Sequence, residues 1–320
     1  MSIDTTQTAP RPTPPTAPAS ASQAVSTQIE SRRRDLASSA FQLMLIASLM
    51  IVLAALLATL ASVAPGGLEV LRSRGVADFI QRPFSIRPQQ TGVYQGIVGT
   101  VTSALIVTLV AFPLGLASAI WIEEYAGDTR ISRLINVVIR NLAGVPAIVY
   151  GLLGYAIFVA GPFKSITGGR SVLSAGLTLS VLVLPIVIIT SAEAIRAVPS
   201  SLRDGGYAMG ATRWQVTRTL VLPNAIGGIL TGTILGLARA LGEAAPLILI
   251  GAKQSGFSAG NWGDLTGDFT ALPVLISDWS TRPVSQWDGV TQALILVTLV
   301  IILGINAAGI VLRNRFTDKD

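Results

Sequence analysis

Residues 191–223 read SAEAIRAVPSSLRDGGYAMGATRWQVTRTLVLP and form a polar interval between two long apolar runs. The interval holds two patterns typical of helix capping boxes, with a glycine between them that indicates a helix end. These candidate helix ends are Ser201 with Asp204, Thr212 with Gln215, and Gly210. Pro223 is expected to close the second helix. The interval therefore predicts two short helices joined at a glycine, which would suit a docking surface; an ordinary amphipathic loop is the alternative.

Long apolar runs lie on both sides of this interval. Five stretches free of charged residues are each 22 residues or longer, and a membrane-spanning helix needs about 20. They lie between Asp35 and Glu69, Arg87 and Glu123, Arg140 and Lys164, Arg170 and Glu193, and Asp288 and Arg313. A sixth apolar run, from about Pro223 to Ala252, contains Arg239 and Glu243. Six spans would place both termini on the same side of the membrane.

The composition agrees with a membrane protein and excludes several kinds of chemistry. Of the 320 residues 51% are hydrophobic and 12% charged, with a mean hydropathy of +0.63, whereas a soluble domain has roughly 25% charged residues. The chain has neither Cys nor His, which excludes disulfides, thiol catalysis, thiolate or imidazole metal ligands and histidine-dependent triads. The net charge of +6 is interpreted as a signal of membrane orientation and not of nucleic-acid binding.

Lys and Arg collect unequally at the ends of the predicted spans. If the N-terminus is cytoplasmic, thirteen of these residues fall on the cytoplasmic side and eight on the opposite side. Cytoplasmic loops carry the excess of Lys and Arg in membrane proteins. We therefore expect both termini in the cytoplasm.

Five segments complete the predicted domain organisation. Residues 1–35, rich in Pro, Ala, Ser and Thr, are expected to form a disordered cytoplasmic tail. Residues 36–63 predict a first transmembrane helix that is retained and not cleaved as a signal peptide. Residues 64–91 and 253–288 predict external loops with short interfacial helices. Residues 317–320 are expected to be a cytoplasmic C-terminus.

The sixth run carries a glycine stripe followed by two charges. Gly228, Gly232 and Gly236 repeat every four residues, a spacing that lets membrane helices approach closely. In a continuous helix, Arg239 and Glu243 would fall within about 20° of this stripe and face protein or a water-filled path. Two interpretations stay open: an internal ion pair that locks the helix against a neighbour, or an anion path in which Glu243 holds Arg239 until the anion arrives.

The interval at 204–223 resembles the EAA loop of ABC-importer permeases. That pattern has an acidic residue, two small residues, a glycine six positions after the acid, and a closing Leu-Pro. The matching positions are Asp204, Gly205, Gly206, Gly210, Leu222 and Pro223. Asp-Gly-Gly replaces the family's Glu-Ala-Ala, and each Gly weakens a helix by about 1 kcal/mol relative to Ala. The resemblance implies that residues 201–223 seat in a cytoplasmic ATPase and transmit its closure to the membrane helices.

The chain contains no G-x-x-x-x-G-K-[ST] phosphate loop, so ATP hydrolysis is expected from a separate subunit. An ion-driven secondary carrier would need no such partner, but it would leave the helix-turn-helix interval unexplained.

Three tracts resemble phosphate-specific ABC permeases of the PstA type: residues 238–252, 141–159 and 272–279. The resemblance covers roughly residues 92–316. The Arg-x-x-Gly-Glu core that ends at Glu243 is shared with the sister permease type, PstC. The PstA type is favoured by Ala-Pro-Leu at residues 245–247, by Leu-Pro-Val at 272–274 and by Glu-Glu-Tyr-Ala at 123–126.

This resemblance implies an all-α integral membrane protein with six transmembrane helices and the type I ABC importer permease fold, in the bacterial cytoplasmic (inner) membrane. It implies a transport subunit without its own ATPase site, cofactor, metal or nucleic-acid partner. Arg239 and Glu243 would lie in the substrate path, and Asp204, Gly205, Gly206, Gly210, Leu222 and Pro223 would contact the ATPase.

The implied partners are a homologous permease of the PstC type, a dimer of PstB-type ATPase subunits that use ATP and Mg, and an extracytoplasmic phosphate-binding protein of the PstS type. Membrane lipid would surround the spans. The implied function is ATP-driven import of inorganic phosphate. Two alternatives remain: a permease for another oxyanion, sulfate or molybdate, and a membrane scaffold that senses phosphate.

Overall fold

The computed structural model describes residues 36–253, 260–283 and 285–317, and in this part of the chain every regular element is a helix. The predicted tail at 1–35 and most of the predicted C-terminus at 317–320 lie outside the described residues. The α-helices are α2 (Leu36–Arg74), α3 (Val76–Gln81), α4 (Tyr94–Ile120), α5 (Arg130–Ala143), α6 (Ala147–Gly154), α7 (Lys164–Thr167), α8 (Val172–Arg196), α9 (Ser200–Ala208), α10 (Arg213–Val216), α11 (Leu222–Gly242), α12 (Ala245–Ile250), α13 (Leu272–Ser280) and α14 (Gln286–Thr317). Three π-helical turns join some of them: η1 (Trp121–Tyr125), η2 (Tyr155–Val159) and η3 (Thr217–Val221).

The chain divides into two units, Met1–Leu60 and Ala61–Asp320. In the first unit, residues 39–60 of α2 expose almost only apolar side chains all around the helix. A helix that is apolar on every side needs lipid or protein around it. This part of α2 therefore has the character of a membrane anchor.

The last part of α2 corrects a predicted boundary. Residues 64–91 were expected to be a loop, but α2 continues through Pro65 to Arg74 and α3 follows. The helix continues because it packs against α14: a Cβ added at Gly67 would lie 2.9 Å from the Gln292 carbonyl carbon. Close packing between helices therefore extends the helix beyond the apolar run.

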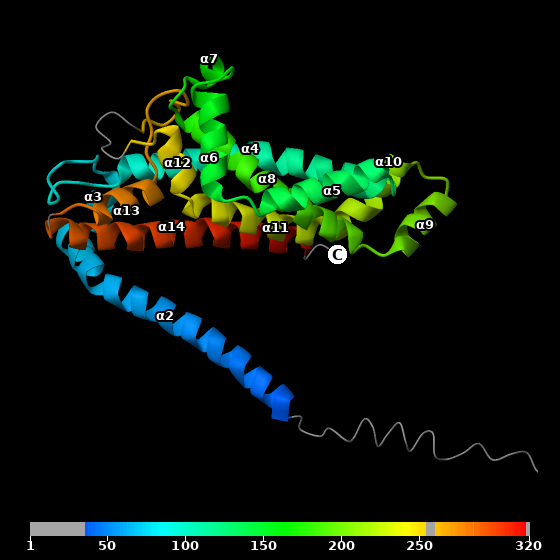
Figure 1. Cartoon of the computed structure of the whole chain (residues 1–320), viewed down its shortest axis with the longest axis horizontal. Coiled ribbons are helices and arrows are strands. Elements are labelled where there is room, and N and C mark those ends of the chain that lie inside the picture. The colour runs from blue at the N-terminus through cyan, green and yellow to red at the C-terminus, as the bar shows by residue number, and fades with distance from the viewer. Residues whose placement is uncertain (1–35, 254–259, 284, 318–320) are drawn as a thin grey trace, which may run out of the picture. The chain divides into compact units, whose positions relative to one another are not determined.

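In the second unit, α8 lies between α4 and α11 and packs along both (Figure 1). The predicted glycine stripe forms the α8–α11 contact. Cβ atoms added at Gly228 and Gly236 would lie 2.7 Å from Ala194 Cβ and 3.0 Å from Val183 Cγ1, and Gly232 faces Thr190. The missing side chains let the two helices approach closely.

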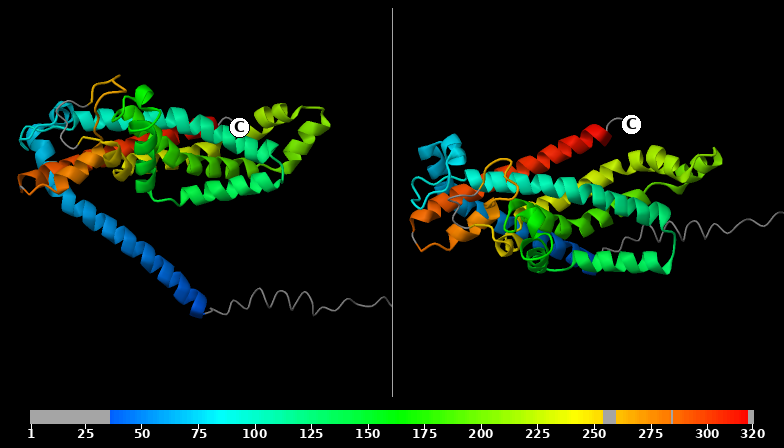
Figure 2. Two further views of the ribbon diagram at one scale, coloured as in Figure 1. Left: turned by 45° about the horizontal axis from the view of Figure 1, so that its top comes forward. Right: turned by 90° about the horizontal axis from the view of Figure 1, so that it is seen from above.

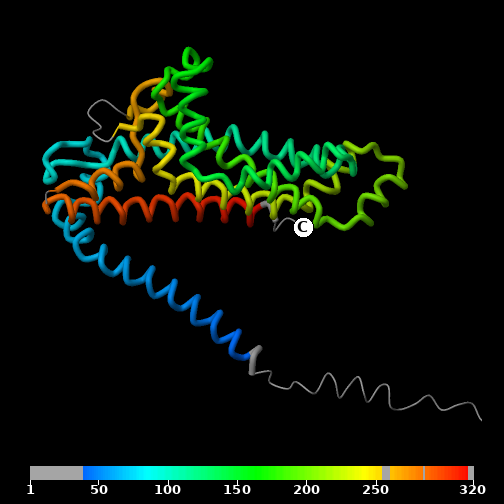
Figure 3. The backbone as a smooth tube through the Cα atoms, in the orientation of Figure 1, coloured from blue at the N-terminus to red at the C-terminus, as the bar shows by residue number. Residues whose placement is uncertain are grey.

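Within the described residues, five helices are long and apolar enough to cross a membrane, and a bent helix pair makes a sixth if it counts as one span. The bend of this pair lies in the run between Arg140 and Lys164, which was expected to hold one span. Residues 130–143 and 147–159 form two helical segments at 101°, and Figure 3 shows the chain turning between them. Pro146 lies at the bend, where its ring and missing N–H disfavour a continuous helix.

The sixth run is also broken. α11 ends at Gly242, Glu243 has extended backbone angles (φ −85°, ψ 116°), and α12 begins at Ala245. Pro246 in the first turn of α12 is compatible with a helix start but not with a continuous helix. α12 packs against α6, where a Cβ at Gly151 would lie 2.7 Å from Pro246 Cα. Two interrupted helices thus meet in the second unit.

The second unit has two distinct ends. Figures 1 and 2 show α9 and α10 at one end, and α3 and α13 at the other. The C-terminal end of α14 points toward the α9 end. Helix α13 confirms a short helix in the predicted loop at 253–288, of which residues 254–259 lie outside the description.

Candidate functional site

The helix-turn-helix predicted around Gly210 is present. α9 ends in a Schellman motif, in which the Ala211 N–H donates to the Gly206 carbonyl (3.1 Å) and the Gly210 N–H to the Tyr207 carbonyl (2.9 Å). Gly210 has φ +80°, which favours glycine because it has no Cβ. The turn is therefore specified by local sequence.

One of the two predicted capping boxes forms. Thr212 accepts a hydrogen bond from the Gln215 N–H, and the Gln215 side chain accepts one from the Thr212 N–H (2.8 Å). The box at Ser201 and Asp204 is wrong: the residue before α9 is Pro199, two positions earlier than Ser201, and no side chain caps the helix. Pro at this boundary sets the helix start because its fixed φ suits the residue before a first turn.

The second helix does not end at Pro223. α10, η3 and α11 run on as one helical segment from Arg213 to Gly242. In the π turn the Leu222 N–H bonds to the Thr217 carbonyl, five residues back. This wider turn accommodates Pro223, which cannot donate a backbone hydrogen bond. Movement of the turn at Gly210 would therefore pass directly into a membrane span.

The two glycines that replace the alanines of the EAA pattern differ in their surroundings. A Cβ at Gly206 would lie 2.8 Å from Val216 Cγ2 and 2.9 Å from Leu220 Cδ1. A Cβ at Gly205 would meet nothing within 4 Å. Gly206 therefore allows α9 to pack against α10 and η3, whereas Gly205 faces open space.

Glu123, Glu124 and Tyr125 of η1 each contact an arginine near the helix-turn-helix. Glu124, with 4% of its side chain exposed, pairs with Arg203 of α9 at 2.9 Å. Arg203 also donates to the carbonyls of Ile195 (2.8 Å) and Val198 (2.7 Å) at the end of α8. The other two contacts are Glu123 with Arg196 (2.5 Å) and Tyr125 with Arg213 (5.8 Å from the ring centroid).

These contacts connect α9 to α4 and α8, and no sequence pattern predicted them. The partners are 79 residues apart for Glu124 and Arg203, so no local spacing links them. Apolar side chains are also exposed around the turn, and no sequence pattern singled them out. Met209 is 88% exposed and Trp214 52%. Such exposed apolar groups mark interaction surfaces when they gather in one place.

Arg239 and Glu243 lie at the break between α11 and α12. Arg239 Nε is 3.7 Å from Glu243 Oε1, and the side chains are 48% and 24% exposed. This distance allows electrostatic attraction but exceeds that of a good hydrogen bond. The expected common helical register is wrong for Glu243, because α11 ends before it. The two charges are nevertheless brought together.

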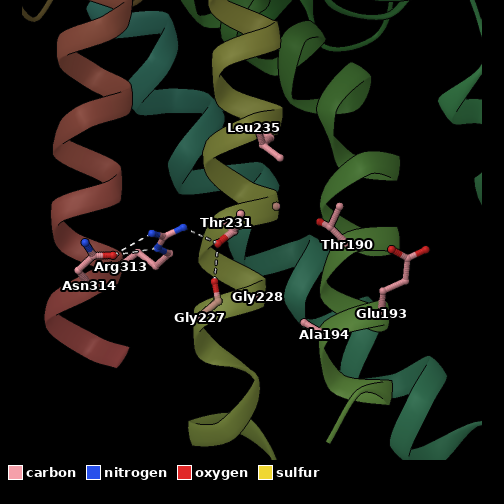
Figure 4. A pocket seen from close by; sticks show the side chains of 10 residues that line it. Thr190, Glu193, Ala194, Gly227, Gly228, Thr231, Leu235, Arg313 and Asn314 are labelled. Atoms are coloured by element: carbon pink, nitrogen blue, oxygen red, sulfur yellow. Dashed lines mark hydrogen bonds between the residues drawn. The ribbon is translucent and has the colours of Figure 1, made fainter. Parts of the chain in front are cut away.

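Arg239 lies on an open face of α11, together with Leu235 and Gly242, all of them exposed. Ala240, not Arg239, continues the buried glycine stripe. Toward the α9 end, the same face borders a groove of about 520 Å³ between α8, α11 and α14 (Figure 4). The guanidinium of Arg313, from α14, donates there to Thr231 Oγ1 of α11 at 3.3 Å.

Tyr150 bridges the bend between α5 and α6. Its side chain is 5% exposed, and its hydroxyl donates to the Leu142 carbonyl at 2.7 Å. This bond holds α6 at the bend, and α6 in turn packs against α12.

A bundle of apolar spans, a helix-turn-helix continuous with one span, and a charged pair at a helix break together define a membrane transport subunit. The chain belongs to the family of binding-protein-dependent transport system inner membrane components, whose profile matches residues 111–317. It is therefore a multi-pass membrane permease of the ABC importer class, and a permease of this class works with further permease, ATPase and binding-protein subunits.

Two named relatives show how far the similarity extends. The chain is 33% identical over 223 residues to the phosphate transport system permease protein PstA 1 of Mycobacterium tuberculosis (strain ATCC 25618 / H37Rv), covering 69% of this chain and 70% of that protein. It is 41% identical over 155 residues to the probable ABC transporter permease protein YqgH of Bacillus subtilis (strain 168), or 48% of this chain. That match spans half the length of the B. subtilis protein.

Solved structures share the fold at low identity. A chain of a bacterial alginate ABC transporter, in complex with an alginate pentasaccharide-bound periplasmic protein, matches with a TM-score of 0.62 at 15% identity, covering 89% of this chain and 99% of that one. A chain of the inward-facing MetNI methionine ABC transporter matches with a TM-score of 0.52 at 18% identity, covering 71% and 94%. These similarities confirm the predicted type I importer permease fold.

Proposed function

We propose that this chain is the PstA-type permease subunit of an ATP-driven importer of inorganic phosphate. The observation that carries the cargo assignment is the similarity to phosphate transport system permeases, at 30–33% identity over about 70% of the chain. The charged pair at the α11–α12 break supports it, because an arginine on an apolar span offers fixed donors to an oxyanion.

Arg239 would bind the anion and Glu243 would hold the arginine between transport cycles. The 3.7 Å separation and partial exposure of the pair leave guanidinium donors open to a second acceptor. The planar fork of Arg matches two phosphate oxygens at once. Binding has to remain weak, since an anion that binds tightly in the path would not leave it.

A homologous permease of the PstC type would cover the open face of α11. An exposed Arg within an apolar span costs about 2.5 to 3.5 kcal/mol on insertion scales, so this face is expected to meet protein or water and not lipid. The path would then run between the two permeases along Arg239. The groove beside Thr231 lies on the same helix and would continue that interface toward α9.

The helix-turn-helix would dock a PstB-type ATPase through residues Asp204, Gly205, Gly206 and Gly210 and the exposed Met209 and Trp214. Leu222 and Pro223 lie where the coupling segment enters α11, so docking movement would reach the span that carries Arg239. Arg203 would transmit the same movement to α4 through Glu124. ATP and Mg would be used by the ATPase dimer, with no cofactor in this chain.

The subunit would lie in the bacterial cytoplasmic membrane with both termini in the cytoplasm. The α9 end would then face the cytoplasm, and the end with α3 and α13 would face outward. An extracytoplasmic phosphate-binding protein of the PstS type would deliver phosphate to the outer end.

Uptake of labelled phosphate tests this function. Cells that lack the chain should not accumulate labelled phosphate through this system, and restoring the chain should restore uptake. Excess unlabelled phosphate should block that uptake, whereas excess sulfate or molybdate should not. Competition by sulfate or molybdate would indicate another oxyanion. Intact assembly without uptake would indicate a phosphate-sensing scaffold.

A further inference from the structure

A second hollow, of about 610 Å³, lies where η2 and α7 meet the loop at residues 266–268. Helix α7 lies near α12 and far from the end of the unit that holds α9 and α10 (Figure 1). Arg170 lies two residues before α8 begins, at the end of α8 opposite to α9, so under the proposed orientation the hollow lies at the outer end of this span. Tyr155 and Val159 form an apolar part of its wall, and Lys164 and Arg170 contribute charged side chains.

The charge of the hollow is positive. Residues 161–170 contain Lys164 and Arg170 but no Asp or Glu. In the part of the chain that the structure describes, neither side chain takes part in an ion pair. The carboxylate that lines the hollow, that of Asp268, is paired with Lys253. Two cationic groups therefore remain available to an anion.

Glycines let the walls of the hollow approach each other closely and leave room for the Arg170 side chain. Arg170 runs across Gly251, where an added Cβ would lie 2.7 Å from Arg170 Cδ. Gly168 has φ +77°, and a Cβ there would lie 2.7 Å from the Thr266 carbonyl oxygen. Lys164 folds back along Gly169, with Cε 3.8 Å from the position of a Cβ. The two basic side chains are thus held at the same hollow.

The hollow is joined to the Arg239 site by one short helix. Gly251, under Arg170, terminates α12, and α12 begins two residues after Glu243. Six helical residues span about 9 Å at 1.5 Å per residue. The opposite wall, η2, continues α6, which packs against α12. The hollow and the charged break therefore lie at the two ends of one packed unit.

We propose that Lys164 and Arg170 form an outer anion site, which receives inorganic phosphate at the outer surface before it reaches Arg239. The proposal rests on the proposed function for its ligand. Lys supplies a point charge and Arg a planar pair of donors. Both side chains are exposed, so binding is brief and sensitive to salt, which suits a site that must pass its ligand on. The site retains released phosphate near the path and limits its loss to the outside.

The test uses the whole complex in lipid vesicles, with ATP on the ATPase side and labelled phosphate with its binding protein on the other. Phosphate uptake and ATP hydrolysis are measured together. The double variant Lys164→Gln/Arg170→Gln should transport about fivefold less phosphate per ATP hydrolysed, equivalent to about 1 kcal/mol at 1.4 kcal/mol per tenfold. ATP hydrolysis stimulated by the loaded binding protein should match the wild type, and the uptake difference should narrow at high salt.

Two further variants serve as controls. Arg87→Gln removes an exposed basic residue outside the hollow and should leave phosphate per ATP within about twofold of wild type. Lys164→Arg/Arg170→Lys keeps both charges and should retain most of the uptake per ATP.

Unchanged phosphate per ATP in the double Gln variant would overturn the proposal. A parallel loss of stimulated ATP hydrolysis would also overturn it, because the two residues would then dock acidic groups of the binding protein and not phosphate. If the wild-type complex itself takes up no phosphate, the proposed function fails, and the outer anion site falls with it.

Discussion

The chain interrupts its helices at the two places to which the proposed function assigns ATPase docking and anion binding, and the two interruptions are built differently. At Gly210 the turn is made by neighbouring residues: a positive φ, two Schellman hydrogen bonds and the Thr212–Gln215 capping box. Beside Glu243 no side chain caps the start of α12, and α12 is instead packed against α6. Local hydrogen bonds hold the turn at Gly210, whereas the break at Glu243 is marked locally by Pro246 and the segment beyond it is held by tertiary contacts. The first therefore suits a docking element, and the second a site whose shape changes with helix packing.

The largest expected effect comes from removing the positive charge at the helix break, which leaves the turn at Gly210 unchanged. Arg239→Gln removes the guanidinium from the helix break and should lower phosphate uptake about a hundredfold or more, equivalent to about 2.7 kcal/mol. Membrane insertion and co-purification of the ATPase should be unaffected, because the side chain is half exposed and packs no core. Uptake by cells expressing each variant measures the effect. Arg239→Lys keeps the charge without the planar fork and should give an intermediate loss; full uptake by the Gln variant would contradict an anion path at Arg239.

Gly210→Val should have the opposite pattern of effects, because it disturbs the local turn and not the charged helix break. A β-branched residue at φ +80° costs roughly 1 to 3 kcal/mol, so the turn should distort and the ATPase should no longer co-purify. Gly263→Val is a matched control, since Gly263 has φ +89° and open space around it but lies outside the helix-turn-helix. Equal recovery of the ATPase with the two variants would show that the turn at Gly210 is not its docking element.

Arg203→Gln should weaken the connection between the turn and the spans. It leaves Glu124, which is 4% exposed, without its charged partner, and breaking a buried pair costs about 3 kcal/mol. We expect about tenfold less phosphate transported per ATP hydrolysed, with a lower melting temperature. The companion variant Arg196→Gln breaks a pair whose arginine is 58% exposed and should cost less than about 1 kcal/mol. Equal effects of the two variants would rule out a special role for the Arg203–Glu124 pair.

The smallest expected effect distinguishes the two adjacent glycines of α9. Gly205→Ala places a methyl group in open space and should stabilise the helix by about 0.5 to 1 kcal/mol. Gly206→Ala would place its Cβ 2.8 Å from Val216 and should destabilise the segment. Thermal unfolding of the purified complex measures both changes. Equal shifts of stability in the same direction would contradict the packing of Gly206 against Val216.

Sequence patterns predicted the features that depend on neighbouring residues. The glycine stripe from Gly228 to Gly236, the capping box at Thr212 and the stop at Gly210 are all confirmed. The bend at Pro146 and the end of α11 had local signals in Pro146, Gly242 and Pro246, but long apolar runs favoured continuous spans.

Contacts between distant segments had no such signal. Glu124 and Arg203 are 79 residues apart, and only the packing of α4 beside α8 brings η1 to the helix-turn-helix. The extension of α2 to Arg74 likewise follows from its contact with α14. The open face around Arg239 is a property of the folded chain, because the exposed side of α11 is set by which side α8 covers.

The most direct test of the account compares Arg239→Gln and Gly210→Val in one assay on the reconstituted complex. We expect Arg239→Gln to retain the ATPase in full amount but to transport no phosphate, and Gly210→Val to lose the ATPase while the permease remains folded in the membrane. Transport at the wild-type rate by Arg239→Gln, or full ATPase recovery with Gly210→Val, would contradict the separation of anion handling from ATPase docking in this chain.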